Sequence, residues 1–463
     1  MTRQRKGTLQ KAPFLFVVFA GVAWLLSGCN PGKGTVAYLG ATLWDGTGAP
    51  PVANAVVLVD QSGHIERAGP RDSVRVPRGA ALVHLNGKWI IPGLIDARTH
   101  TARWTLTRFL AYGVTSVRDA GSPQDSILAL RRATSLGSVV GPRLYVSGAA
   151  IDAGPGASPP ALVVQTTEEA RKAVDTRTLA DAAQAMVNPG IDTSLLAAVM
   201  DEASAVQLPV AALLGKVDAV RATHMGVRAI DGLTGIVEAT VANPAPYLKA
   251  HDDFYQGWNL AERGWAGLDS AGLERTAKTL TRSGVAIIPA LGWHQLWAHL
   301  EDSTYLTTLD LEGVPPSVQD AWDVPDLIAR ARLGYDDYLA FRKSRPVQDR
   351  FVRIFRRLGG LVAAGSDAAN PLLAPGAALH DELALLVAAG LTPREALLAA
   401  TKSGARLLRA DSIGAVREGA VADFVILSAS PLESIGNSRK IEGVVSRGVY
   451  RTEAQLRALW PHP

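Results

Sequence analysis

Between about residues 91 and 407 the chain repeats one unit eight times: a short apolar segment, a loop, and a stretch of helical periodicity. The apolar segments read, in order, IIPGLID, GVTSVRD, RLYVSG, AAQAMV, LPVAALL, VRAID, GVAIIPAL and LVAAGSD. Segments between them, such as TTEEARKAV and SLLAAVMDEASAV, have the pattern of amphipathic helices. Eight such units predict an α/β fold, a (β/α)8 TIM barrel, with functional side chains at the C-terminal ends of its strands.

The two regions that flank this repeat have a different pattern. Residues 35–90 and 408–455 contain short runs that alternate apolar and polar positions, with Asp-Gly and Ser-Gly pairs between some of them. Such alternation is typical of strands with one buried face, and these pairs are common in tight turns. We therefore expect a small β-sandwich domain built from both chain ends, with the barrel of residues 91–407 inserted between them.

The first 28 residues predict a secretory signal peptide. Four basic residues and no acidic one precede or begin the sixteen-residue apolar run 13–28. A membrane-spanning anchor is the alternative, but a spanning helix needs roughly 20 apolar residues. A basic start, a short apolar segment and small residues before the cleavage point favour the signal peptide.

The apolar run ends in Leu26-Ser27-Gly28-Cys29, which resembles a bacterial lipobox. This resemblance implies cleavage before Cys29 and a lipid on its sulfur, with residues 29–34 as a tether. The expected location is the bacterial cell envelope, anchored to a membrane on its periplasmic or extracytoplasmic face. Cys29 is the only cysteine, so no internal disulfide can form.

Charge gives no sign of a nucleic-acid partner. The net charge of +4 equals the four basic residues of the predicted signal peptide, so the remaining chain is neutral overall. Nucleic-acid binding depends on clustered positive charge that neutralises phosphates. We expect no nucleic acid among the partners of this chain.

Several long motifs carry a resemblance to a known family. The segments IIPGLIDARTH, AYGVTSVRDAG, GSDAANPLLAPGAALHDELALLVAAGLTPREALLAATKSGARLL and GAVREGAVADFVIL resemble the amidohydrolase superfamily. Within it they are most similar to the imidazolonepropionase- and prolidase-like branch, and the similarity runs from about residue 35 to 452. The resemblance implies a metal-dependent TIM barrel flanked by a β-sandwich that is split between the chain ends.

The family holds one or two divalent metals with six side chains at the strand ends. These are a His-x-His pair after strand 1, a Lys (usually carboxylated) after strand 4, single His residues after strands 5 and 6, and an Asp after strand 8. The resemblance places these roles, in that order, at Arg98, His100, Gln184, Leu213, Gly232 and Asp367. Only His100 and Asp367 keep the residue type of the family.

Four of the six positions therefore hold residues that do not ligate a metal usefully. A catalytic zinc takes three protein ligands, and two remain here. We expect no metal cofactor, and we expect the guanidinium of Arg98 to pair with Asp367 at the barrel mouth. The other histidines that could rescue a site, which are His64, His84, His224, His294 and His299, are interpreted as surface or packing residues.

Two functions remain open from the sequence. The first is a non-catalytic pseudoenzyme that binds a small molecule at the barrel mouth or interacts with another protein. The alternative is an active hydrolase on carbon–nitrogen bonds of dipeptides or non-peptides. It would use zinc or another divalent metal in a non-standard set, or metal-free chemistry in which His100 or Asp367 acts as general base.

Overall fold

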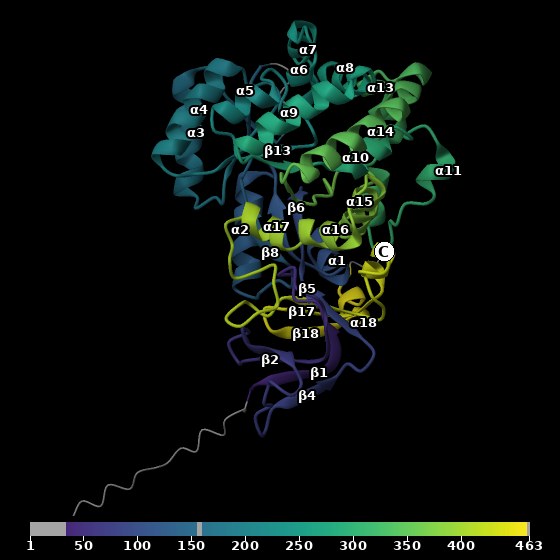
Figure 1. Cartoon of the computed structure of the whole chain (residues 1–463). Coiled ribbons are helices and arrows are strands. Elements are labelled where there is room, and N and C mark those ends of the chain that lie inside the picture. Colours follow the sequence, from purple (N-terminus) through teal and green to yellow (C-terminus); the bar gives the residue numbers. More distant parts are fainter. Residues whose placement is uncertain (1–33, 155–159, 461–463) are drawn as a thin grey trace, which may run out of the picture.

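The computed structural model describes residues 34–154 and 160–460, and the predicted signal peptide and Cys29 lie outside them. Both chain ends contribute to one eight-stranded sheet at one end of the molecule (Figure 1). Its strands are β1 (Val36–Leu43), β2 (Val52–Val59), β3 (Ile65–Pro70), β4 (Ala81–His84), β5 (Trp89–Pro92), β16 (Phe424–Leu427), β17 (Ile441–Ser446) and β18 (Val449–Thr452). The order is β18-β17-β16-β5-β1-β2-β3, and β4 branches off by pairing with β1.

The two chain ends meet where β5 pairs antiparallel with β16, from Phe424 opposite Pro92 to Leu427 opposite Trp89. These hydrogen bonds join all eight strands into one branched sheet rather than the two separate sheets of the predicted sandwich. The strand β5 ends at Pro92, two residues beyond the predicted domain boundary. Neighbouring residues of these strands pack in two different cores: Tyr38 and Val57 belong to one cluster, and Leu39 and Val56 belong to another.

The middle of the chain forms a barrel of parallel strands, as predicted. Its strands are β6 (Leu94–Thr99), β7 (Val114–Asp119), β8 (Arg143–Val146), β11 (Ala185–Val187), β12 (Val210–Ala212), β13 (Ala229–Asp231), β14 (Ala286–Ile288) and β15 (Leu361–Val362). The short strands β9 (Ala150–Asp152) and β10 (Ala161–Val163) extend the sheet beside β11. The barrel closes through backbone bonds from Ala183 N to Val146 O (2.8 Å) and from Ala97 N to Ala364 O (2.8 Å).

Helices surround the barrel (Figure 1). They are α1 (Thr105–Ala111), α2 (Gln124–Ser135), α3 (Thr167–Leu179), α4 (Thr193–Ala205), α5 (Ala219–His224), α6 (Ile236–Thr240), α7 (Ala245–Ala250), α8 (Phe254–Gly264), α9 (Ser270–Arg282), α10 (Leu291–Trp297), α11 (Ser303–Leu306), α12 (Pro316–Asp320), α13 (Val324–Ala331), α14 (Tyr335–Arg357), α15 (Ala377–Ala388), α16 (Pro393–Ala399), α17 (Lys402–Leu407) and α18 (Glu453–Arg457). Several begin at a side-chain cap; Asp192, for example, accepts the backbone N–H groups of Ser194 and Leu195 at the start of α4. Within residues 34–154 and 160–460, no helix has the length and hydropathy to cross a bilayer.

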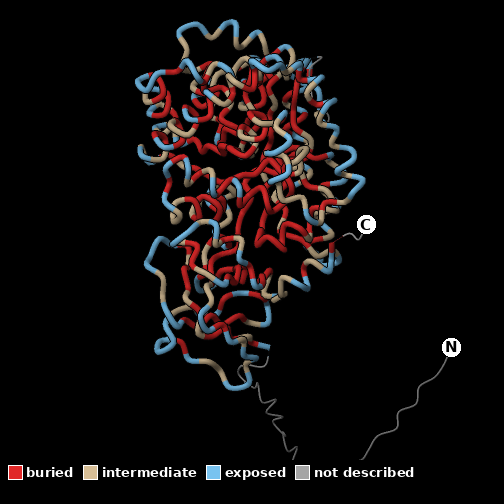
Figure 2. The backbone as a smooth tube through the Cα atoms, turned by 90° about the vertical axis from the view of Figure 1, so that its right-hand side faces the viewer, coloured by how far each residue is buried: buried red, intermediate tan, exposed pale blue. Residues whose placement is uncertain are grey.

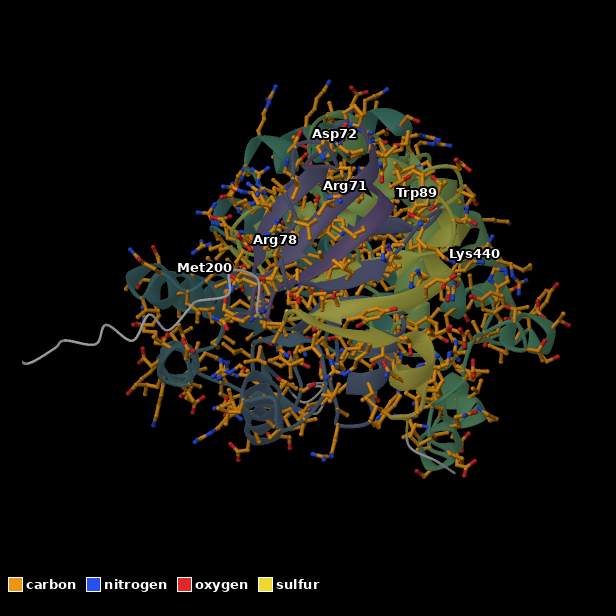
Figure 3. The ribbon with its side chains drawn as sticks, turned by 90° about the horizontal axis from the view of Figure 1, so that it is seen from below. Arg71, Asp72, Arg78, Trp89, Met200 and Lys440 are labelled. Carbon is orange, nitrogen blue, oxygen red and sulfur yellow. The ribbon has the colours of Figure 1, made fainter. Side chains whose placement is uncertain are left out.

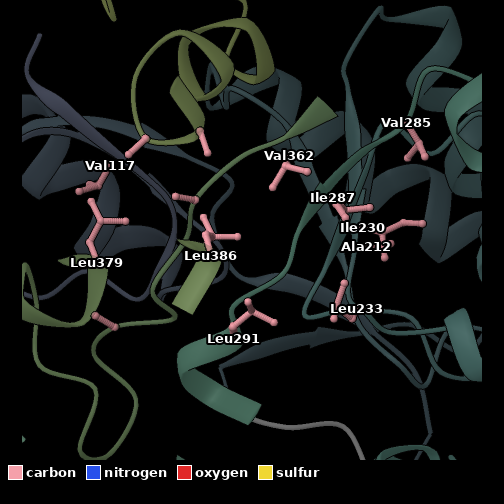
Figure 4. Packing of buried hydrophobic residues seen from close by; sticks show 14 of the residues in the cluster. Val117, Ala212, Ile230, Leu233, Val285, Ile287, Leu291, Val362, Leu379 and Leu386 are labelled. Carbon is pink, nitrogen blue, oxygen red and sulfur yellow. The ribbon is translucent and has the colours of Figure 1, made fainter. Parts of the chain in front are cut away.

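The main core lies between the barrel strands and these helices (Figures 2 and 4). Outward-facing strand residues such as Ile230 and Ile287 pack there with Leu233 and Leu291. The inside of the barrel is different, because six of the eight buried residues in its cluster are alanine. Because these interior side chains are small, the barrel has room for long ones, and arginine side chains occupy that volume.

Candidate functional site

Arg98 is the penultimate residue of β6 and points into the barrel mouth, where its side chain is 6% exposed. Its Nε lies 2.8 Å from Oδ1 of Asp367, so the predicted ion pair is confirmed. Its Nη1 donates to a second carboxylate, at Oδ2 of Asp231 (2.7 Å). The guanidinium therefore bridges two buried carboxylates, one at the end of β13 and one in the segment after β15.

A second arginine completes this network. Arg118, the penultimate residue of β7, is fully buried and reaches both oxygens of Asp231 at 2.8 and 3.1 Å through Nη2. Its Nη1 also donates to the carbonyl oxygen of Ala97 (2.6 Å). We call Arg98, Arg118, Asp231 and Asp367 the ionic half of the mouth. Its two positive and two negative charges cancel, as a buried set of charges requires.

Asp367 holds its charge in this setting. Burial alone would raise the pKa of its carboxyl group, but Arg98 and His100 outweigh burial and lower that pKa below the ordinary value. Its backbone has φ of 59°, and its N–H donates to Arg98 O (2.9 Å), which ties the segment after β15 to β6. The carboxylate is therefore fixed in place and charged at neutral pH.

His100 follows β6 and lies at the edge of this network. Its Nε2 is 3.4 Å from Oδ1 of Asp367, and its side chain is 32% exposed. It is thus the ionisable group of the predicted set that is open to a ligand or to water. An imidazole beside a carboxylate can accept a proton from a bound molecule.

The other predicted positions are uncharged. Leu213 follows β12 and Gly232 follows β13, and both line the cavity at the mouth. Gly232 has φ of 65°, and a Cβ placed on it would lie 3.5 Å from Cδ1 of Leu213. The two positions are therefore neighbours, as the resemblance implies for two ligands of one metal site.

Gln184 lies apart from the other five positions. It immediately precedes β11, so it sits at the N-terminal end of its strand, and it does not line the cavity. Its Nε2 is buried and has no hydrogen-bond partner among the residues that the structure describes. Two residues further on, the sulfur of Met186 lies 3.9 Å from Nη2 of Arg118. We call Gln184, Met186 and Leu213 the neutral half of the barrel.

This donor set does not fit a catalytic metal. Of the six predicted positions, only His100 and Asp367 carry a ligand atom at the mouth, and Asp367 is engaged by Arg98. Across residues 34–154 and 160–460, no group of three His, Cys, Asp or Glu side chains is placed to hold an ion. The positive guanidinium of Arg98 would also repel a cation beside it.

A cavity of about 420 Å³ opens at the mouth. Polar groups of Ser122, Asn188 and Asn370 line it together with His100 and Asp367. An aromatic wall of Phe254, Tyr255, Trp258 and Trp293 covers another part of the lining, with Trp258 and Trp293 packed edge to face at 6.1 Å. A cavity that is largely apolar with a few polar groups is typical of a small-molecule site.

Two buried carboxyl groups near the site were not predicted. Asp96 on β6 accepts hydrogen bonds from the backbone N–H (2.9 Å) and the hydroxyl of Ser366, and burial raises its pKa to about 7. Glu382 on α15 accepts a bond from Gly292 N (3.0 Å), and burial raises its pKa to about 8. The signal for Asp96 was available in the sequence, because an acidic residue inside the apolar run GLIDA has to be hydrogen-bonded or paired when buried.

His294 supports the floor of the mouth. It is buried, and its Nδ1 lies 2.9 Å from Oε2 of Glu262 while its Nε2 lies 3.0 Å from the carbonyl oxygen of Gly232. Gln348 on α14 bonds to the same Glu262 (2.7 Å). His294 is thus a packing residue, as predicted, and it connects strand β13 to the helices that cover the mouth.

Comparisons with known proteins place this geometry in context. A family model described as the amidohydrolase family matches residues 257–450. No curated protein gives a significant match.

Solved structures with the same fold share little sequence with this chain. A Bifidobacterium longum protein assigned as a prolidase is similar at 23% identity and a TM-score of 0.68, over 91% of this chain and 95% of that one. Bottromycin amidohydrolase is similar at 20% identity and a TM-score of 0.69, over 93% of this chain and 90% of that one. An ochratoxinase of A. niger is similar at 17% identity and a TM-score of 0.66, over 90% and 96%. The family match over residues 257–450 and the barrel shared with these structures support a place for this chain in the amidohydrolase superfamily.

Proposed function

We propose that this chain binds a small molecule at the mouth of an amidohydrolase barrel and does so without a metal. The observation that carries the proposal is the position of Arg98, whose guanidinium bridges Asp231 and Asp367 at 2.7 and 2.8 Å. A metal-dependent hydrolase uses its ion to lower the pKa of a bound water to about 7. A guanidinium has no lone pair and cannot coordinate that water. In this proposal the chain is a pseudoenzyme.

The lining of the cavity supports a neutral ligand with a flat or apolar part. The charges of the ionic half already satisfy one another, so they offer no free charge to a ligand. His100, Asn188 and Asn370 supply hydrogen bonds, while Trp258 and Trp293 supply a surface on which a ring can pack. Such a division between a few polar groups and an aromatic wall gives orientation as well as affinity.

A hydrolase acting on carbon–nitrogen bonds is the second candidate. The pair of His100 and Asp367 favours it, because a partly exposed imidazole 3.4 Å from a carboxylate can take a proton from water. General base catalysis of this kind contributes typically 10²–10⁴-fold, which is far less than a metal-bound hydroxide supplies. Zinc or another divalent metal in an unrecognised set of ligands belongs to the same alternative.

Metal content separates the two candidates. The purified chain is incubated with zinc, manganese or iron, passed through a desalting column and analysed for metal per chain. We expect no stoichiometric metal for the natural chain or for Arg98→His. One tightly held ion per natural chain would overturn the proposal.

A three-fold variant is the positive control for metal binding. Arg98→His, Leu213→His and Gly232→His restore the residue types of the family at the mouth, beside His100 and Asp367, and the proximity of residues 213 and 232 supports a shared ion. Gln184 is left unchanged because it precedes β11 and does not line the cavity. We expect this variant to retain metal, although more weakly than an intact family site, because φ of 65° at Gly232 strains any side chain placed there.

We also propose that the chain is lipid-anchored in the bacterial cell envelope. The support is the sequence of residues 1–29, with Cys29 as the lipidated residue. Cys29→Ala should leave an unprocessed precursor or release the protein from membranes. Fractionation of cells with an antibody to the chain measures this, and a processed variant that fractionates like the natural chain would contradict the anchor.

A further inference from the structure

A short loop on the terminal sheet carries three arginines outward. Val74, in the loop between β3 and β4, is buried with Ala37, Leu39, Val56 and Leu58, so it fixes the loop to one face of the sheet. Arg71, Arg75 and Arg78 on the same loop are exposed. Among the described residues, none of the three forms an ion pair within 4.0 Å, and Arg71 and Arg78 lie on the face seen in Figure 3.

The start of the described chain lies at the same place. Ala81 N donates to Thr35 O (2.9 Å), and β4 runs beside the beginning of β1 with Leu82 opposite Ala37. Leu82, on β4, is an apolar side chain that is 53% exposed. Only five residue steps separate Cys29 from Gly34, and a chain of that length spans at most about 18 Å.

We propose that Arg71, Arg75, Arg78 and Leu82, here called the arginine face, dock on an anionic phospholipid surface. This inference rests on the proposed lipid anchor at Cys29, which would hold the arginine face beside a membrane. The lipid headgroups supply negative charge to the three guanidinium groups, and Leu82 can enter the apolar edge of the headgroup layer. The arginine face thereby fixes the orientation of a protein that the anchor alone would leave free to rotate.

The charge of the arginine face supports this partner. Asp72 is the one acidic residue between Arg71 and Leu82, so the segment has a net charge of +2. Each basic residue near an anionic membrane strengthens binding about fivefold, and this attraction decays within a Debye length of roughly 8 Å at physiological salt. A short tether therefore matters, because it keeps the three arginines within range.

Docking in this way has a functional result. The helices α8 and α13, which contribute Phe254 and Leu327 to the cavity lining, lie at the end of the molecule away from β1 and β4 (Figure 1). The cavity would then face the aqueous compartment, and its ligand would arrive from solution rather than from the lipid.

The test uses the full lipidated chain, purified from membranes and reconstituted in vesicles. Leu82→Cys carries a fluorophore on the arginine face, and Arg330→Cys carries it at the rim of the mouth. Vesicles contain phosphatidylcholine alone or a mixture with phosphatidylglycerol, together with a lipid whose headgroup bears a quencher. We expect quenching at position 82 in the anionic vesicles, reversed by high salt, and little quenching at position 330 in either.

Charge variants test whether the three arginines cause the quenching at position 82. Arg71→Gln, Arg75→Gln and Arg78→Gln together should lower the ratio of docked to undocked protein about 100-fold. The matched control removes three exposed cations from α9, as Arg275→Gln, Lys278→Gln and Arg282→Gln, and should leave the quenching at position 82 unchanged.

The outcomes separate this inference from the anchor. Mass spectrometry that finds no lipid on Cys29 overturns the anchor and this inference with it. A lipidated chain with equal quenching in neutral and anionic vesicles overturns this inference alone. So does a triple arginine variant that quenches like the natural chain, or an α9 control that loses quenching to the same extent.

Discussion

The ionic half and the neutral half of the barrel differ in the side chains that they bury. The ionic half, on β6, β7, β13 and the segment after β15, buries four charged side chains, and each carboxylate lies within 2.8 Å of at least one guanidinium. The neutral half on β11 and β12 contains an amide, a thioether and an aliphatic side chain. Both halves belong to one barrel whose interior is otherwise mostly alanine.

The difference shows which positions of the barrel interior need a counter-charge. A buried carboxylate is costly unless it is paired, so a mouth that keeps Asp231 and Asp367 needs positive charge in a fixed place. Arg98 and Arg118 supply it. Uncharged positions need no counter-charge, so residues of the neutral half can be substituted without a compensating change elsewhere.

Removing Arg98 should have the largest effect and would test the ionic half directly. Arg98→Ala leaves the buried carboxylate of Asp367 without its guanidinium partner, while Asp231 keeps Arg118 at both oxygens. We therefore expect a loss of about 3–5 kcal/mol in the free energy of unfolding. Arg98→Ala combined with Asp367→Asn should recover part of this loss, because Asp231 still has Arg118. Denaturant unfolding measures both variants.

Arg330→Ala serves as the comparison for that experiment. Its guanidinium side chain is 59% exposed and pairs with Asp326 on the same helix. Exposed pairs of this kind contribute little, about 0.3–0.5 kcal/mol. An Arg98→Ala chain that is destabilised no more than Arg330→Ala would break the distinction between the ionic half and an ordinary surface pair.

Two buried carboxyl groups outside the ionic half extend the comparison, because their charge changes near neutral pH. Burial raises the pKa of Glu382 to about 8 and that of Asp96 to about 7, so both bind more protons in the folded than in the unfolded state at neutral pH. Stability should therefore fall as pH rises from 6.5 to 8, by at most about 1.4 kcal/mol per pH unit for each group. The buried His380, whose pKa is lowered to about 3 by burial, is uncharged in the folded state but partly protonated in the unfolded state near pH 6.5, so it opposes this fall slightly at the acidic end of the range.

Glu382→Gln isolates one of these contributions. The amide oxygen can still accept the bond from Gly292 N, so the fold should persist. We expect a smaller decrease of stability between pH 6.5 and 8 than in the natural chain. An unchanged pH dependence would mean that Glu382 is already ionised in the folded state.

The smallest expected effect concerns the neutral half. Gln184→Leu replaces a buried amide, whose Nε2 has no partner among the described residues, with an apolar side chain of similar size. We expect stability to stay level or rise by about 1 kcal/mol. Gln348→Leu is the control, since that buried amide donates to Glu262 and accepts from Arg345, both at 2.7 Å. If Gln184→Leu destabilises as much as Gln348→Leu, the neutral half contains a bonded network of its own.

The sequence predicted the barrel and the joining of the chain ends because periodic patterns and turn residues are local signals. It predicted the pairing of Arg98 with Asp367 because both stand in long recognisable motifs. It did not predict Asp231 or Arg118 as partners, since pairing across a barrel depends on which strands face one another. A signal was nevertheless present: each is a charged residue in a short apolar strand, VTSVRD or AID, and a buried charge needs a counter-charge.

The pairing of β5 with β16 has a consequence during synthesis. Pro92 is synthesised before its partner Phe424, which lies more than 330 residues later in the chain. At roughly 5–20 residues per second, the ribosome needs on the order of 20 to 60 seconds to make that distance. For all that time the edge of the apolar strand Trp89–Pro92 has no β16 to cover it, and an open strand edge attracts other chains. The yield of soluble protein should therefore depend on what shields that edge until the last strands are made.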